Sequence, residues 1–165
     1  MSRLEGTPSE IQKYLALLEE NPRCIAAWTF ELSEARLSQR PAPGDWSVSE
    51  ILAHLRACAD LWTHSIYAML AVENPHLPDF DERRWAKAAR YTALGFHASF
   101  GAYRLERRQL LQVLGELRLE DWSRTALIGG RAHSVFSQAR RMAKHEAEHC
   151  AQMEDLLSGS GSPPE

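Results

Sequence analysis

Three histidines have the spacing and the surroundings of metal ligands. His145 and His149 stand four residues apart in one predicted helix, and His54 lies in another. Residues four apart on a helix lie on one face, about one turn from each other, so two imidazoles can bind one ion. An unpaired polar group on an apolar face costs roughly 1–3 kcal/mol, and a divalent metal would satisfy all three rings. The sequence therefore predicts a metal site.

The positions of these histidines on their helices support the prediction. His145 and His149 fall inside the apolar stripe of the last predicted helix, and Gln152 follows the same edge. A lone histidine there is more often a core residue bonded to a carbonyl group, but a pair favours a metal. His54 lies at the margin of its own stripe, one turn before Cys58. Antiparallel packing of the two helices would bring His54 to the pair, with Cys58 as a further ligand or a reactive thiol.

The same segment also fits a zinc-peptidase pattern. His145-Glu146-Ala147-Glu148-His149 matches His-Glu-x-x-His, in which the glutamate is a general base. Such peptidases need a third ligand, usually well downstream, and no histidine follows His149. The sequence therefore argues against a peptidase. It leaves Glu146 either as a general base or as a solvated charge.

An ion held by three neutral imidazoles keeps its positive charge and at least one open position. This arrangement is typical of catalytic sites, since structural zinc sites usually have four protein ligands. Such an ion lowers the pKa of a bound water or thiol toward neutrality. A thiolate could then attack an electrophile, or a hydroxide could hydrolyse one. Imidazoles suit zinc, nickel, iron or copper, so the donor set leaves the ion open.

Other polar residues have two interpretations each. Glu50 lies one turn before His54 and could accept its free ring proton, or it could only complete a capping box with Ser47. Arg108, at the margin of the third long helix's stripe, could bind a substrate carboxylate or be an ordinary surface charge. Three tryptophans are interpreted as packing residues: Trp46, Trp62 and Trp122.

Helical periodicity dominates the chain, which has almost no strand signal. Capping boxes at 7–10 and 47–50 begin two helices, and Asn21-Pro22 is expected to break the first near Glu20 and to start a piece through about Leu32. Long helices are predicted over 48–72, 91–117 and 134–157. A short turn of helix is predicted over 33–40, a loop plus a short helix over 79–90, and a connection over 121–131. This pattern predicts an all-α four-helix bundle with short accessory helices. We expect one domain over residues 1–157 and a flexible tail over 158–165.

Composition narrows the function classes. The 165 residues are 44% hydrophobic and 25% charged, with a net charge of −3, which is ordinary for a soluble globular protein. Basic residues form no stripe, so we expect no nucleic-acid partner. The start of the sequence has no apolar signal core and no apolar run reaches membrane-spanning length, so we expect a cytoplasmic protein without a membrane partner. Three cysteines without a Cys-x-x-Cys spacing indicate buried thiols: Cys24, Cys58 and Cys150.

The chain resembles the DinB/YfiT-like superfamily of metal-binding four-helix bundles. The resemblance rests on the segment 46–55 preceded by Pro43-Gly44, on Glu120-Asp121-Trp122, and on the final group His145, His149 and Gln152. It implies a bundle with down-up-up-down connectivity and a divalent metal held by His54, His145 and His149. It also implies a homodimer. Characterised members include S-transferases that use bacillithiol or mycothiol and a mycothiol-dependent maleylpyruvate isomerase.

These features together lead to one main functional hypothesis and three alternatives. The main hypothesis is a metal-dependent enzyme, a thiol-dependent S-transferase acting on a small electrophilic substrate. It implies a divalent metal (zinc, nickel or iron) and a low-molecular-weight thiol cosubstrate. The alternatives are a metal-dependent hydrolase, a non-catalytic metal- or ligand-binding stress-response protein, and a structural bundle whose histidines are satisfied internally.

Overall fold

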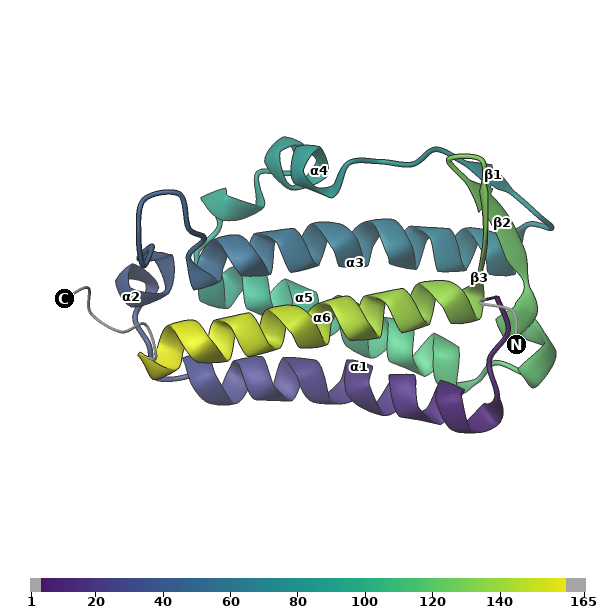
Figure 1. Cartoon of the computed structure of the whole chain (residues 1–165), viewed down its shortest axis with the longest axis horizontal. Helices are drawn as coiled ribbons and strands as arrows, with labels where there is room; N and C mark the ends of the chain where they lie inside the picture. Colours follow the sequence, from purple (N-terminus) through teal and green to yellow (C-terminus); the bar gives the residue numbers. More distant parts are fainter. Residues whose placement is uncertain (1–3, 160–165) are drawn as a thin grey trace.

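The computed structural model describes residues 4–159. Four long helices form the body of the protein: α1 (Pro8–Thr29), α3 (Val48–Ala71), α5 (Phe96–Gly115) and α6 (Val135–Ser158) (Figure 1). The short helices are α2 (Glu34–Ser38), α4 (Glu82–Ala88) and two 3-10 turns, η1 (Tyr91–Ala93) and η2 (Leu119–Ser123). Three short strands complete the chain: β1 (His76–Leu77), β2 (Thr125–Ile128) and β3 (Arg131–Ser134).

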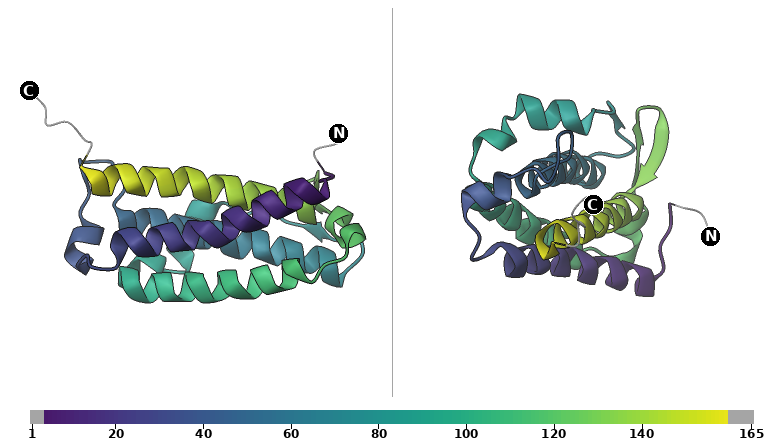
Figure 2. Two further views of the ribbon diagram at one scale, coloured as in Figure 1. Left: turned by 90° about the horizontal axis from the view of Figure 1, so that it is seen from below. Right: turned by 60° about the vertical axis from the view of Figure 1, so that its left-hand side comes forward.

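The four long helices pack as a bundle in which α6 lies between α1 and α3. Helix α5 contacts α1 and α3 on the opposite side (Figure 2). Helices α1 and α6 run in one direction, and α3 and α5 run in the other (Figure 1). The start of α3 therefore lies beside the second half of α6. This is the contact that brings His54 near His145 and His149.

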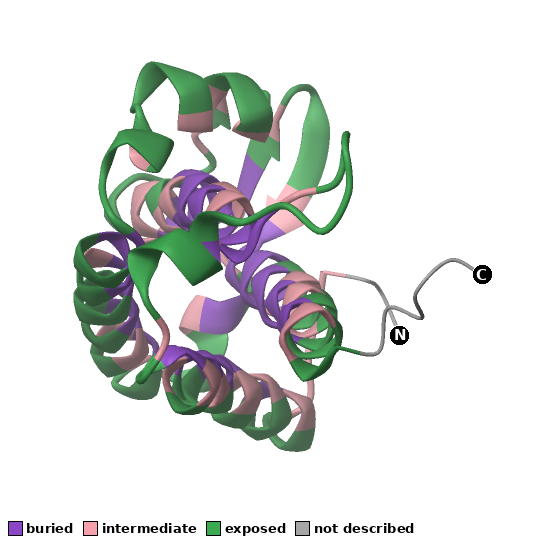
Figure 3. Ribbon diagram, turned by 90° about the vertical axis from the view of Figure 1, so that its left-hand side faces the viewer, coloured by how far each residue is buried: buried purple, intermediate pink, exposed green. Residues whose placement is uncertain are grey.

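Apolar side chains from every long helix fill the interior (Figure 3). One cluster, which includes Leu18, Trp62 and Phe136, fills the half of the bundle next to the strands. A second, which includes Ile25, Leu55 and Phe96, fills the other half. Burying each such side chain contributes about 1.5–3 kcal/mol, so this core fixes the relative position of α3 and α6.

Helix α1 does not break at Asn21-Pro22, so the expected division into two pieces is wrong. The helix runs from Pro8 to Thr29 with Pro22 inside it. A proline there removes one backbone hydrogen bond and normally kinks or breaks a helix. Here both residues are buried, and Asn21 Nδ2 donates to the Ala143 carbonyl oxygen at 3.3 Å. Packing against α6 therefore outweighs the local cost of the proline.

The expected connection over 121–131 contains a β-hairpin, so the all-α prediction needs correction to a mostly helical bundle with a small sheet. Strands β2 and β3 pair antiparallel, and β1 adds in parallel to β2. Gly129 and Gly130 have φ of 55° and 78° at the tip. Left-handed backbone at both central residues is typical of a type I′ hairpin turn, which glycine favours. The Gly-Gly pair was the sequence signal for this hairpin.

The third long helix begins at Phe96, later than the expected Tyr91. Arg90 has a φ of 54°, which ends the preceding segment, and a 3-10 turn separates it from α5. On α5 the apolar side chain of Leu105 is 60% exposed. The buried positions include Tyr103 and Arg107. Because Arg107 is charged, a prediction based on apolar residues alone does not identify its position as part of the core.

The described part of the chain ends directly after helix α6. Helix α6 ends at Ser158, and Gly159 follows with a φ of 69°, the left-handed backbone that often follows a helix. All but the first two residues of the expected tail 158–165 lie outside the described residues. Within residues 4–159, no helix is both long and apolar enough to cross a membrane.

Candidate metal centre

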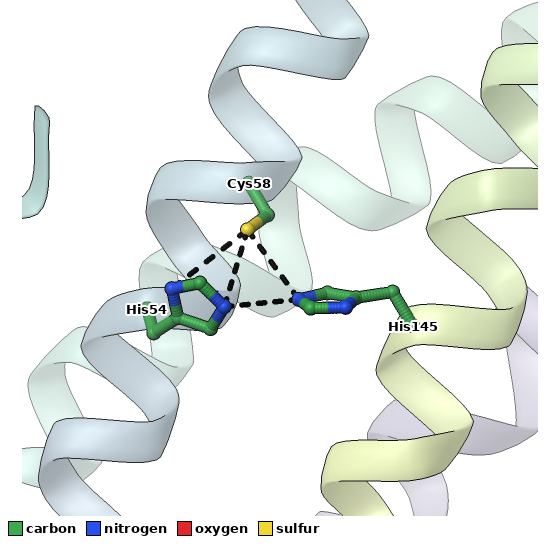
Figure 4. A group of neighbouring side chains, drawn as sticks. All are labelled: His54, Cys58 and His145. Atoms are coloured by element: carbon green, nitrogen blue, oxygen red, sulfur yellow. Dashed lines mark hydrogen bonds between the residues drawn. The ribbon is translucent and has the colours of Figure 1, made fainter. Parts of the chain in front are cut away.

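The side chains of His54 from α3 and His145 from α6 meet directly. Their Nε2 atoms are 3.0 Å apart, and both rings are partly exposed (Figure 4). Two imidazole nitrogens at this distance either share one proton or face a common cation. The capping box of Ser47 and Glu50 sets the start of α3, so that His54 lies near this end of the helix.

Cys58 lies one turn after His54 and completes a tight group of three. Its Sγ atom is 3.6 Å from the Nε2 atom of His54 and 3.6 Å from that of His145. The three ligand atoms lie within 4.8 Å of one another, as a metal site requires (Figure 4). The sequence left Cys58 as a further ligand of this site or a reactive thiol beside it. The structure places it inside.

His149 lies beside the group, one turn further along α6. Its ring centroid is 5.0 Å from that of His54 and 4.6 Å from that of His145. The Nδ1 atom of His149 is 2.8 Å from Gln152 Oε1, so the ring donates this hydrogen to the amide. This bond fixes the tautomer and leaves the Nε2 lone pair free to bind a cation.

Two tryptophans line the cluster, which the sequence did not indicate. Trp46 lies 5.2 Å from the His54 ring, and Trp62 lies 5.2 Å from the His145 ring, measured between centroids. A guanidinium stacks on each: Arg83 on Trp46 at 5.4 Å and Arg141 on Trp62 at 4.6 Å. The cluster is therefore bordered by aromatic rings and positive charge.

The surroundings of His54 and His145 favour the neutral form of these two rings. Burial lowers the pKa of His54 to about 4, and His149, His145 and Arg83 add to the shift. Burial and His149 also lower the pKa of His145. Neutral imidazole is the form that binds a metal. These two rings can thus bind a cation at neutral pH without first losing the proton of an imidazolium.

These shifts predict a pH dependence for the metal-free protein. Between pH 6.5 and about 4 the unfolded chain protonates His54 while the folded chain resists, so the free energy of unfolding falls as the pH falls. Urea unfolding at about pH 7 and about pH 5 measures the loss. His54→Gln should make it smaller, whereas His64→Gln, which removes an exposed histidine from the same helix, should not. Equal losses in wild type and His54→Gln would contradict the shift.

Glu50 does not contact His54 in the structure. Its Oε2 atom accepts from the Ser47 backbone amide at 2.9 Å, and both carboxylate oxygens accept from the Arg40 guanidinium. The Glu50 carboxylate therefore completes the capping box with Ser47, and it is not the partner of the His54 ring.

Glu146 faces the bundle core and not the histidines. It is 1% exposed, and both its oxygens accept from Arg107 of α5, one of them at 2.8 Å. Burial and this carboxylate raise the pKa of neighbouring Tyr103. A carboxylate held in this way cannot act as a general base, so the expectation for Glu146 is replaced by a structural role. On α5, Arg107 is buried, whereas the neighbouring Arg108 is exposed.

Helix α4 is attached beside the cluster through Asp60 of α3. The Oδ2 atom of Asp60 accepts from Trp85 Nε1 at 3.1 Å and from the Tyr91 hydroxyl. Burial and Asp60 raise the pKa of Tyr91 to about 12. Helix α4 carries Arg83 and Glu82, which binds Arg141 at 3.3 Å. Asp60 therefore holds the positively charged border of the cluster in place.

Asp60→Ala is expected to loosen this attachment without unfolding the bundle. The substitution leaves two donors without their acceptor, and α4 has no buried residue of its own. Amide hydrogen exchange across residues 80–93 should become at least tenfold faster (about 1.4 kcal/mol). Asp60→Asn retains an acceptor oxygen and should lie much closer to wild type. Unchanged exchange in Asp60→Ala would show that other contacts hold the segment.

Comparison with known proteins agrees with this architecture. The chain matches the DinB superfamily over residues 17–153. A protein of Bacillus licheniformis, described as a candidate metal-dependent hydrolase, is 31% identical over 86 residues, which are 50% of this chain and 47% of that protein. The match thus spans about half the length of that relative.

A solved structure shows the same fold. YfiT from Bacillus subtilis, described as a candidate metal-dependent hydrolase with an unusual four-helix bundle topology, aligns with a TM-score of 0.80. The alignment has 17% sequence identity and covers 96% of this chain and 92% of that chain. With the match over most of its length, the chain belongs to the DinB superfamily.

Proposed function

We propose that the protein is a metal-dependent enzyme in which His54, His145 and His149 hold one divalent cation. The observation that carries the proposal is the convergence of these three imidazole rings from α3 and α6. At a zinc–nitrogen distance of about 2.0–2.1 Å, imidazoles around one tetrahedral ion have centroids about 5 Å apart. The three centroid distances, 5.1, 5.0 and 4.6 Å, fit this arrangement.

The reaction that we propose is transfer of a low-molecular-weight thiol to a small electrophile. A divalent ion would lower the pKa of the thiol and act as a Lewis acid. In the transfer a carbon–sulfur bond forms, the bond to the leaving group breaks, and the thiol proton departs with that group. The rings of Trp46 and Trp62 exclude water from one side of the cluster, and Arg83 and Arg141 stabilise an anionic thiolate.

A metal-dependent hydrolase is the second candidate. Its support is the description of the Bacillus licheniformis and Bacillus subtilis relatives as candidate hydrolases. In that reaction water takes the place of the thiol as nucleophile. The same imidazoles and the same positively charged border would serve both reactions, so the nucleophile distinguishes them.

Turnover assays on the protein loaded with one metal at a time separate these functions. We expect consumption of a thiol with an electrophile such as a chlorinated dinitrobenzene, lost with a chelator and restored by zinc, nickel or iron. Hydrolysis of activated esters without thiol would favour the hydrolase. Stoichiometric metal with neither activity would contradict an enzyme and favour a metal- or ligand-binding stress-response protein.

Three further properties belong to the proposal. We propose down-up-up-down connectivity, because the long helices run in that order (Figure 1). We propose a cytoplasmic location, because Cys24, Cys58 and Cys150 are free thiols. We also propose a homodimer that binds neither nucleic acid nor membrane. Sedimentation at several protein concentrations tests the dimer.

A further inference from the structure

The contacts of Cys58 match one face of a coordination tetrahedron. With zinc–nitrogen distances of about 2.0–2.1 Å and a zinc–sulfur distance of about 2.3 Å, a tetrahedral site has N···N edges of about 3.3 Å and N···S edges of about 3.5 Å. The structure has an N···N distance of 3.0 Å between His54 and His145 and two N···S distances of 3.6 Å to Cys58. The positions of all three atoms therefore fit those of ligands around one tetrahedral ion.

We infer that Cys58 is a fourth protein ligand, so that the site is a closed set of three nitrogens and one sulfur. This inference rests on the proposed metal site and assigns its fourth position. The resemblance to the superfamily implied three histidine ligands and an open position. In this chain the fourth position is occupied by a side chain from the same helix as His54.

The spacing of His54 and Cys58 along α3 allows both side chains to bind one ion. His54 and Cys58 are four residues apart, so their side chains leave the same helical face one turn from each other. Cys58 is 1% exposed, and its Sγ atom has both Nε2 atoms as neighbours. A sulfur enclosed in this way cannot reach a substrate by itself, but it can bind an ion held between the rings.

A hydrogen-bonded trio is the alternative explanation of the same contacts. In that arrangement the thiol donates weakly to one imidazole, and one imidazole donates to the other. The trio does not need His149, yet the His149 ring also turns toward the group while Gln152 binds its Nδ1 atom. A cation bound by the trio explains why a third imidazole packs against it, and pairwise hydrogen bonds within the trio do not require that ring.

A sulfur ligand has chemical consequences. Imidazoles with a thiolate in tetrahedral geometry favour zinc over ions that prefer six oxygen ligands. The thiolate also takes the position that a substrate thiol or water would occupy. An external thiol must therefore displace Cys58 or enter as a fifth ligand, so Cys58 controls access to the ion.

Cobalt spectroscopy and zinc X-ray absorption test the assignment on the full chain. Cobalt-loaded wild type should show a thiolate-to-cobalt charge-transfer band in the near ultraviolet, and the zinc form should show one sulfur at about 2.3 Å. Cys58→Ser should lose both signals and bind zinc roughly tenfold more weakly or worse. The double variant with Cys24→Ser and Cys150→Ser keeps only Cys58 and should retain both signals.

The outcomes separate this inference from the proposed function. One bound metal per chain with only nitrogen and oxygen ligands would overturn the role of Cys58 and leave the histidine site standing. Sulfur signals that persist in Cys58→Ser would overturn it as well. Failure of wild type to bind any metal in a defined ratio would overturn the proposed function and the Cys58 ligand together. If Cys58→Ser is unfolded by circular dichroism, the zinc absorption spectrum of the double variant decides alone.

Discussion

His145→Ala is expected to weaken zinc binding by on the order of 100-fold or more (about 2.7 kcal/mol) and to leave the bundle folded. His145 has a central position in the cluster, since its Nε2 atom contacts both the His54 ring and the Cys58 sulfur. It is only half-buried, so truncation removes little of the apolar core. In this variant the loss of metal binding can therefore be measured without a loss of the fold.

Competition with a chromogenic chelator measures the zinc affinity, and circular dichroism reports the fold. His64→Ala is the matched control, because His64 is an exposed histidine of the same helix α3. It should bind zinc as wild type does. If His145→Ala retains zinc within a factor of about three of wild type, the ligand assignment is wrong.

Glu146→Ala is expected to lower the free energy of unfolding by about 3–5 kcal/mol. Arg107 is 3% exposed, and Glu146 binds its guanidinium through both oxygens. Removing the carboxylate leaves a buried positive charge without compensation, which costs far more than the bond itself contributes. The pair joins α5 to α6, so its loss removes a buried contact between these two helices.

The double variant Arg107→Met, Glu146→Leu distinguishes a buried charge from a loss of packing. It removes both charges and retains apolar volume, so it should recover much of the lost stability. Glu148→Ala, at an exposed position of the same helix, is the control for helix propensity. Urea unfolding of all four proteins gives the comparison. A loss below about 1 kcal/mol in Glu146→Ala would show that the pair is not essential for stability.

Local sequence signals predict the parts of this structure that depend on neighbouring residues. The capping boxes at Thr7 and Ser47 begin α1 and α3 as expected, and Gly159 follows the end of α6. The spacing of His145 and His149 correctly places both rings on one face. Such features depend on three or four consecutive positions, which a sequence displays directly.

Features that depend on distant residues could not be predicted in the same way. Arg107 is buried only because Glu146, 39 residues later, meets it in the core. Trp46 and Trp62 line the cluster because α3 packs on α6, and nothing in their own segments indicates that contact. Pro22 remains helical for the same reason. In each of these cases tertiary packing outweighs the structural preference of the local sequence.

Direct titration of metal-free protein with zinc tests the central claim, that the cluster of His54, His145 and His149 is a metal site. We expect one saturable site per chain in wild type and no defined site in the triple alanine variant, with both proteins folded by circular dichroism. Equal binding by the two proteins, or no stoichiometric binding by wild type, would contradict the account.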